Sequence, residues 1–227
     1  MVSKRYLKEE FTALQEIVSA NAVIVDAGAH IGLHSVLMSR IIGPGGVIYA
    51  FEPVKDTYWK LRETLALNRI DNVIAVQSAL KDTVGFEKMN IFPEASSEWN
   101  SFGIPATNED RPIAVEEVPT NTLDSFAKER NISHIDFLKI DVEGVEKYVF
   151  RGAKRLLNEK RIRIISFEVS QAPLEGTNST AKELFDTLES YGYISYEFDP
   201  QTNTFLGPIK DSHVQHKNYY ASYTTLK

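Results

Sequence analysis

Acidic side chains stand at three points of this sequence where the chain pattern predicts the end of a buried strand. Asp26 follows a run of β-branched apolar residues, and a turn with Gly28 and Gly32 comes directly after it. Glu52 follows a second apolar run, and Asp141 follows a third. Ligands of open α/β sheets bind outside the carboxyl ends of the strands, so we expect these acids to share one crevice. A glycine turn there can cradle a nucleotide-like cofactor, and a carboxylate can accept hydrogen bonds from its ribose diol.

The residues of the glycine turn distinguish between cofactors. A dinucleotide-binding turn follows the pattern G-x-G-x-x-G, so that the pyrophosphate meets bare backbone. Here His30 and Leu33 stand where the later glycines would be, and Asp26 places a negative charge beside the phosphates. An acid suits instead the cationic amino group of S-adenosylmethionine. The turn therefore favours S-adenosylmethionine over NAD.

Composition limits the class of protein. The 227 residues, 43% of them hydrophobic, suit one domain with a sizeable core. No apolar run approaches the roughly 20 residues of a membrane span. A formal net charge of -6 without a basic stripe argues against a nucleic-acid partner. The absence of cysteine excludes disulfides, and the polar N-terminus does not resemble a signal peptide, so we expect a cytoplasmic protein.

Strand patterns alternate with helical patterns along most of the chain. This alternation predicts a doubly wound α/β fold, with a mostly parallel sheet covered by helices on both faces. We expect a helix at residues 1–21 that packs on the core, and one domain over residues 22–227. The strands are expected at 23–25, 47–51, 72–79, 136–140 and 162–169, with an antiparallel edge hairpin from 193–198 and 219–226, and helices at 33–42, 55–68, 145–157 and 179–191.

Residues 85–120 form a long insertion rich in proline and small polar residues. Two short strands, near 86–91 and 113–118, are expected to flank a tip that carries Trp99 and Phe102. A long insertion in a compact domain is usually functional or mobile, and two interpretations stay open: a surface loop packed on itself, or a substrate lid. In a lid, the two rings would stack on a cyclic acceptor, with hydroxyls bound by Ser96, Ser97, Asn100 and Ser101.

A second concentrated pattern covers residues 136–146. The predicted strand delivers Asp141 and Glu143 at its carboxyl end, where Gly144 permits the turn into a helix. Lys139 lies inside this strand and needs an acid partner when buried, for which Asp136 or Glu168 could serve. Glu146 is expected in the first turn of the following helix, where a carboxylate favours the helix dipole.

Three motifs of this sequence together resemble the FkbM-type methyltransferases. They are V-D-A-G-A-H-I-G at Val25–Gly32, F-E-P at Phe51–Pro53 and K-I-D-V-E-G-V-E at Lys139–Glu146, and T-L-D at Thr122–Asp124 agrees with them. The resemblance spans about residues 22–170 and leaves out both ends and the insertion. It implies the class I methyltransferase fold, which is Rossmann-like, and S-adenosylmethionine as the methyl donor.

The resemblance also implies roles for individual residues in cofactor binding. Just after the first motif, His34 is expected to line the methionine end of the cofactor together with Gly28 and His30, although a packing or helix-capping role for it stays open. The expected cofactor contacts are Asp26, Gly28, His30 and Gly32 in the first motif, His34 after it, Glu52 at the ribose, Pro53, Ser78, Ala79, Leu80 and Asp82 around the adenine, and Asp141 facing the amino group or a metal.

Methyl transfer from a sulfonium is a direct displacement, so the protein must align the reactants and remove a proton from a hydroxyl acceptor. Asp141, Glu143 and Glu168 are the candidate catalytic residues, since strand ends place them over the crevice. For Glu168, a salt bridge to Lys139 or an arginine stays an equal alternative. A divalent metal such as magnesium is open but not favoured, because Glu168-Val169 replaces the Asp-Asn pair of metal-dependent relatives. No metal ligands are assigned.

The expected function is O-methylation of a hydroxyl on a sugar, a glycan or a natural product. The strand end Ile140–Glu143 differs from the Asn-Pro-Pro-Tyr-like end that often serves N-methylation. An inactive homologue that binds S-adenosylmethionine, an N-methyltransferase of a small molecule and a nucleotide-dependent oxidoreductase stay as alternatives. The expected partner is a small-molecule or glycan acceptor, with neither a nucleic acid nor a membrane span.

Overall fold

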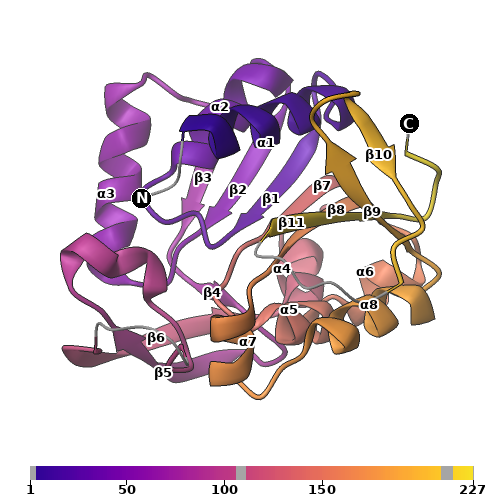
Figure 1. Cartoon of the computed structure of the whole chain (residues 1–227). Coiled ribbons are helices and arrows are strands. Elements are labelled where there is room, and N and C mark those ends of the chain that lie inside the picture. The colour runs from indigo at the N-terminus through magenta and orange to yellow at the C-terminus, as the bar shows by residue number, and fades with distance from the viewer. Residues whose placement is uncertain (1–3, 106–110, 211–216, 227) are drawn as a thin grey trace.

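An eight-stranded sheet in the order β10-β9-β11-β8-β7-β1-β2-β3 forms the centre of the molecule (Figure 1). The computed structural model describes residues 4–105, 111–210 and 217–226, with side chains from residue 8 onward. The strands of this sheet are β1 (Val23–Ala27), β2 (Val47–Phe51), β3 (Val73–Val76), β7 (Ile135–Ile140), β8 (Ile162–Val169), β9 (Ile194–Asp199), β10 (Thr204–Leu206) and β11 (Lys217–Ser222).

Strand directions match the predicted class. The strands from β3 through β2, β1 and β7 to β8 run parallel, and β11 pairs antiparallel with both β8 and β9. The expected doubly wound sheet with an antiparallel edge is therefore confirmed. The short strand β10, antiparallel to β9, extends that edge by one strand beyond the prediction.

Alternating side chains on the strands build two separate apolar cores. Ile24, Phe137 and Ile164 pack under the helices α1 (Lys4–Ile17), α2 (Leu33–Ile42) and α3 (Lys55–Leu67). Their direct neighbours in sequence point to the other face, because successive strand side chains alternate. That face is covered by α4 (Leu123–Glu129), α5 (Glu146–Gly152), α6 (Lys154–Asn158) and α8 (Ala181–Ser190), and α7 (Gln171–Gly176) follows β8.

Two predicted elements, one strand and one helix, are each divided in the structure, so the prediction of a single element is wrong in both cases. The strand expected over 72–79 ends at Val76, because the chain turns there and the Ser78 N–H donates to the Val76 carbonyl. The next two residues form β4 (Ala79–Leu80), which leaves the central sheet. The helix expected over 145–157 is divided at Ala153 into α5 and α6.

The insertion forms a small sheet of its own beside α3. Its strands β5 (Gly85–Ile91) and β6 (Ala114–Asn121) pair antiparallel, and β4 pairs with β6, in the order β4-β6-β5. Both short strands expected here are thus confirmed. Between them lies the 3-10 helix η1 (Glu94–Trp99), and residues 106–110 of the insertion fall outside the described part of the chain.

Within the described ranges, no helix is both long and apolar enough to cross a membrane.

Candidate active site

The glycine turn after β1 joins the ends of three strands. Asp26 is fully buried at the end of β1, and its Oδ2 accepts a 2.6 Å hydrogen bond from the Ser35 hydroxyl. Gly28 has a φ of 82°, and a Cβ there would lie 1.8 Å from the carbonyl oxygen of Asp141. Only glycine allows this approach of the β1 turn to the end of β7. The Gly28 N–H also donates to the Phe51 carbonyl on β2 at 3.1 Å.

Glu52 lies at the end of β2 with 6% of its surface exposed. Its Oε2 accepts the His30 N–H and its Oε1 accepts the Val54 N–H, each at 3.0 Å. Burial raises the pKa of Glu52 to about 7. Each carboxylate oxygen keeps a second lone pair, so a ribose diol can bind without displacing these backbone donors.

A pocket opens between the glycine turn and the insertion. Many of the residues expected to bind the cofactor line it: Gly28, His30, Glu52, Pro53, Ala79, Leu80 and Asp141. The catalytic candidate Glu143 lines it too. These residues come from the turn after β1 and from the ends of β2, β4 and β7, so the tertiary structure gathers the predicted contacts around one cavity.

Other predicted contacts do not form the wall of this pocket. Asp26 and Gly32 lie behind it, since Asp26 is buried and Gly32 begins α2. Ser78 and Asp82 were expected beside the adenine but are not among the residues that line the cavity, although Ala79 and Leu80 between them do line it. The Ser78 hydroxyl donates instead to backbone carbonyls of Ala79 and Pro119.

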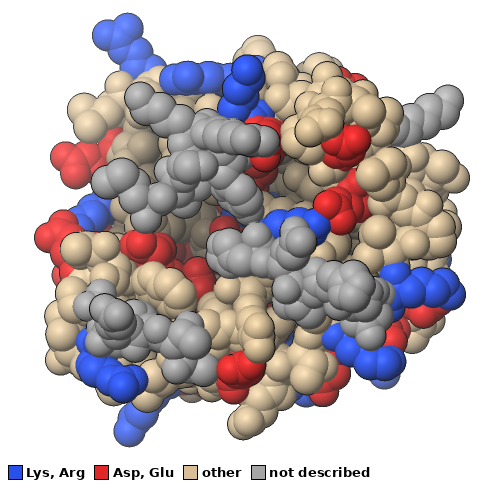
Figure 2. Space-filling model, viewed as in Figure 1, with Lys and Arg blue, Asp and Glu red and all other residues tan. Residues whose placement is uncertain are grey.

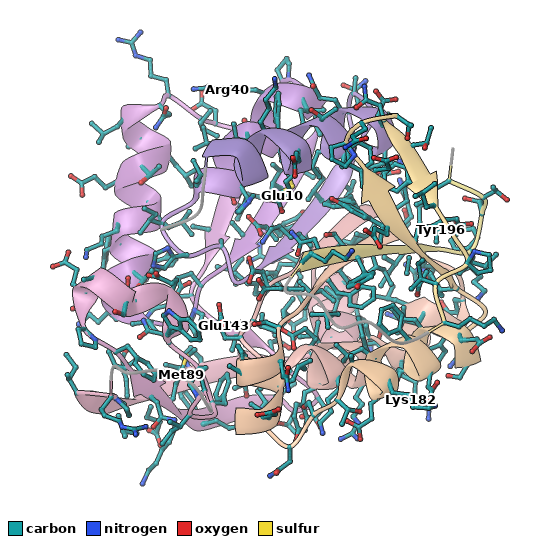
Figure 3. The ribbon with its side chains drawn as sticks, viewed as in Figure 1. Glu10, Arg40, Met89, Glu143, Lys182 and Tyr196 are labelled. Carbon is teal, nitrogen blue, oxygen red and sulfur yellow. The ribbon has the colours of Figure 1, made fainter. Side chains whose placement is uncertain are left out.

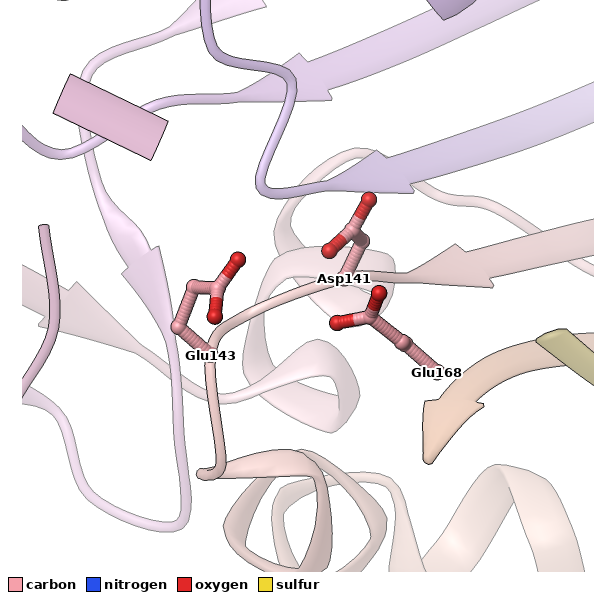
Figure 4. A group of neighbouring side chains, drawn as sticks. All are labelled: Asp141, Glu143 and Glu168. Atoms are coloured by element: carbon pink, nitrogen blue, oxygen red, sulfur yellow. The ribbon is translucent and has the colours of Figure 1, made fainter. Parts of the chain in front are cut away.

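Three carboxylates converge at the ends of β7 and β8. Oxygens of Asp141, Glu143 and Glu168 all lie within 4.8 Å of one another, and Figure 4 shows the three groups pointing toward a common space. Burial raises the pKa values of Glu143 and Glu168 well above the usual range, and repulsion from neighbouring carboxylates adds to it. Such a cluster can share a proton, act as a base near neutral pH, or surround a divalent cation with hard oxygen donors.

Lys139 forms an ion pair with Asp141, which was not among the predicted partners Asp136 and Glu168, and its charge also acts on Glu168. Its Nζ lies 2.8 Å from Oδ2 of Asp141, and 3% of its side chain is exposed. Asp136 stands three residues earlier, near the amino end of β7, where it accepts the Val23 N–H at 2.8 Å. Burial alone would lower the pKa of Lys139, but the carboxylates of Asp141, Asp26 and Glu10 hold it above its usual range.

Glu10 is a buried acid whose charge acts on Lys139 and Glu168, and the sequence did not single it out. It is 7% exposed on α1, and its Oε2 lies 2.7 Å from His34 Nε2. The ring of His34 therefore faces α1, and His34 is not part of the wall of the pocket. The helical spacing could have indicated that Glu10 is buried, because it lies on the same face of the helix as Ala13, Leu14 and Ile17, which are buried.

Glu146 occupies the first turn of α5, as expected, but its side chain is buried rather than solvated. Its Oε1 accepts the Gly144 N–H at 3.2 Å, which ties the side chain to the loop that carries Glu143. Burial raises the pKa of Glu146 to about 7. Glu146 thus helps to fix the loop that carries Glu143, one of the three carboxylates of the cluster.

The insertion tip (residues 92–105) lies against the pocket. Ser97 and Phe102 line the cavity, and Ser97 Oγ lies 2.9 Å from His30 Nε2. An ion pair of 2.6 Å between Lys60 and Glu94 joins the tip to α3. Trp99, expected to stack on an acceptor, is not among the residues that line the cavity. The tip therefore covers the side of the pocket that Glu52 occupies.

Acidic side chains lie in and around this region of the described surface. Figure 2 shows Asp and Glu side chains in the hollow near the middle of the face that carries the site. Glu10 on α1 and Glu143 after β7 are labelled in Figure 3, with the carboxyl ends of the central strands between them in this view. A cationic ligand suits this excess of negative charge.

Solved structures with the same architecture are methyltransferases. A putative methyltransferase from Streptococcus mutans (SMU.1697c), solved in complex with SAH (S-adenosylhomocysteine), matches with a TM-score of 0.54 at 10% identity, over 97% of this chain and 99% of that chain. A putative rRNA-methylase from Clostridium thermocellum matches with a TM-score of 0.53 at 10% identity, over 98% and 97%. The fold is that of the class I S-adenosylmethionine-dependent methyltransferases.

The family follows from the sequence. The family model for the methyltransferase FkbM domain matches residues 26–195, and the chain belongs to this family. Methyltransferase 1 of Beauveria bassiana is 29% identical over 187 residues, which cover 76% of this chain and 72% of the relative. The 31-O-demethyl-FK506 methyltransferase FkbM of Streptomyces tacrolimicus is 29% identical over 204 residues, covering 78% and 75%.

Proposed function

We propose that this enzyme transfers the methyl group of S-adenosylmethionine to a hydroxyl of a sugar, a glycan or a natural product. The observation that carries the proposal is the convergence of Asp141, Glu143 and Glu168 within 4.8 Å beside the pocket. A hydroxyl must lose a proton as it is methylated, and one of these carboxylates can accept that proton as a general base. The name of the Streptomyces relative, which refers to O-methylation of a natural product, supports the same class of acceptor.

Strand order supports one orientation of the cofactor. Glu52 on β2 suits the ribose diol, and Ala79 and Leu80 on β4 suit the adenine beyond it. Gly28 and Asp141, which directly follow β1 and β7, would then lie beside the sulfonium and the amino-acid end. This orientation would direct the methyl group toward Glu168, near the end of β8.

The cofactor supplies a methyl group activated by its positive sulfur. The acceptor oxygen bonds to the methyl carbon as the carbon–sulfur bond breaks, and the bonding electron pair stays on sulfur. Glu168 or Glu143 takes the proton of the acceptor hydroxyl, because a carboxylate with a raised pKa is a better base near neutral pH. Lys139 holds Asp141 in place at 2.8 Å during this step.

The same donors fit a divalent cation. Asp141, Glu143 and Glu168 offer the hard oxygen ligands that magnesium and calcium prefer. A cation held there would lower the pKa of a bound hydroxyl and so replace the carboxylate base. Whether a carboxylate or a cation activates the acceptor hydroxyl, that hydroxyl would lie beside Asp141, Glu143 and Glu168.

The decisive experiment uses methyl-labelled S-adenosylmethionine with panels of hydroxylated metabolites, glycans and amines. We expect label on oxygen, identified by mass spectrometry of the products. Label on nitrogen would contradict the proposal in favour of an N-methyltransferase. Tight binding of S-adenosylhomocysteine with no labelled product from any panel would instead support a homologue that has lost activity.

A further inference from the structure

The sheet face beneath α1 and α2 changes from apolar to polar toward the carboxyl ends of its strands. Asp26 on β1 lies opposite Lys139 on β7, and Glu168 on β8 lies opposite Asn218 on β11. Asp141 follows Lys139 by two residues and so continues the same face. These side chains form a polar row between the apolar core and the crevice.

Glu10 on α1 connects this row to α2. Its Oε1 accepts a 2.8 Å hydrogen bond from Asn218 Nδ2, and its Oε2 lies 2.7 Å from His34 Nε2. Burying a carboxylate is costly unless it is paired or hydrogen-bonded, and both oxygens of Glu10 have partners. Glu10 thereby fixes the side chains of His34 and Asn218 relative to each other.

The polar row carries more negative than positive charge. Glu10, Asp26, Asp141 and Glu168 face one lysine, Lys139. Oδ1 of Asp26 is buried and has no hydrogen-bond partner among the described residues. A buried polar atom without a partner points to a group that a ligand or a water supplies. The amino-acid end of S-adenosylmethionine carries an ammonium that suits the negative charge of this row.

The direction of the cofactor brings its amino-acid end to His34. Adenine and ribose lie over β4 and β2 in the proposed orientation, and the sulfonium lies over Gly28. The remaining atoms then extend toward the first turn of α2, which contains His34. His34 is not among the residues that line the pocket, but one-fifth of its side chain is exposed, and Nδ1 of its ring is not used by the contact with Glu10.

We propose that Glu10 is a positioning residue of the cofactor site, which holds the His34 ring for a hydrogen bond with the amino-acid end of S-adenosylmethionine. The helix α1 is then a wall of the site as well as a part of the core. This proposal rests on the cofactor of the family and not on the acceptor, so it stands or falls separately from O-methylation.

Histidine suits this task in either protonation state. With Nε2–H donated to Glu10, a neutral ring offers Nδ1 as an acceptor for the ammonium. A protonated ring offers Nδ1–H to the carboxylate of the same amino-acid end. Glu10 selects the orientation in both cases, as carboxylates do for histidines at other sites.

Two ligands that differ only at the amino-acid end test the proposal. S-adenosylhomocysteine has that end, whereas 5′-methylthioadenosine lacks it but keeps adenine, ribose and sulfur. We expect Glu10→Ala to weaken S-adenosylhomocysteine by about tenfold, the effect of one lost hydrogen bond to a charged group, and to leave 5′-methylthioadenosine within about twofold. Isothermal calorimetry measures both. The matched control is Glu16→Ala, an exposed acid on the same helix, which should change neither affinity.

Equal weakening of both ligands would mean that Glu10 only supports the fold, and unchanged affinity for S-adenosylhomocysteine would overturn the proposal as well. Glu10→Gln provides a second variant that keeps the size and one acceptor oxygen, and we expect a loss of about threefold to tenfold for S-adenosylhomocysteine alone. Because Glu10 acts through His34, adding His34→Ala to Glu10→Ala should weaken binding no further than the stronger single change. Additive losses would contradict the coupling.

Discussion

The ammonium of Lys139 lies 2.8 Å from Oδ2 of Asp141, two residues further along the same face of the chain. Lys139 is the buried cation that stands next to the carboxylate cluster of Asp141, Glu143 and Glu168. The positive charge of Lys139 thus offsets part of the repulsion among the three carboxylates. The pair serves both the stability of the strand end and the position of Asp141.

Lys139→Met should therefore lower the free energy of unfolding by about 3–5 kcal/mol, the usual cost of breaking a buried ion pair from one side. Urea denaturation measures this loss. Lys154→Met, at an exposed position on α6, is the control and should change stability little. Adding Asp141→Asn should restore part of the loss, and a double variant no more stable than Lys139→Met would contradict the pairing.

Glu52→Ala should weaken S-adenosylhomocysteine by about 1.5–3 kcal/mol, the scale for hydrogen bonds to a charged group. Calorimetry gives the affinity. Glu52→Ala also removes the acceptor of the His30 and Val54 N–H groups. Glu52→Gln is therefore measured beside it, because its side-chain oxygen can still accept one of these hydrogen bonds. Unchanged affinity in Glu52→Ala would remove Glu52 from the ribose site.

Asp141→Asn and Glu168→Gln should each reduce turnover by at least about 10²-fold, the contribution of a general base. Glu168→Gln should shift stability far less, whereas Asp141→Asn also breaks the ion pair with Lys139 and should lower stability. The rate is measured with whichever acceptor the labelling experiment identifies. If EDTA abolishes activity and magnesium restores it, the cluster acts through a metal; activity that survives EDTA rejects only that version. Full activity in both variants would show that the cluster is not catalytic.

Ser97→Ala should speed the dissociation of S-adenosylhomocysteine several-fold, because the contact of 2.9 Å between Ser97 and His30 joins the insertion tip to the glycine turn. Stopped-flow displacement measures this rate. The ion pair of Lys60 with Glu94 lies in water, so Glu94→Gln should have little effect. Equal dissociation rates in Ser97→Ala and the wild type would mean that the tip does not restrain the ligand.

Stability should fall as pH rises toward neutrality, because the folded protein holds protons that the unfolded chain has lost. Burial raises the pKa of Glu146 from 4.5 to about 7 on folding, so its contribution is fully present below pH 4.5 and is lost as pH rises through 7. Glu146→Gln mimics the protonated form and should reduce this fall by about 1–3 kcal/mol between pH 5 and 8.

Denaturation at several pH values measures the slope, with the exposed Glu63→Gln on α3 as the control. A slope in Glu146→Gln as steep as that of the wild type would contradict the assignment.

The fold class and most of the carboxylates near the pocket could be predicted from the amino-acid sequence. Asp26, Glu52, Asp141 and Glu168 each close a strand whose apolar pattern is visible, and parallel strands end at one edge of a sheet. That rule was enough to predict that Asp141 and Glu168 meet. The glycine turn was equally readable, because Gly28 is the residue type that lets the turn approach the Asp141 carbonyl.

Packing between distant elements set the partners that the sequence did not reveal. Glu10 and Asn218 stand 208 positions apart and meet because α1 packs on the sheet face that includes Tyr220 and Asn218 of β11. The pairing of Lys139 with Asp141 was readable from the sequence, because strand residues two apart share a face, although Asp136 and Glu168 were the partners predicted. Periodicity reveals which side of an element is buried, but packing decides which side chains it meets there.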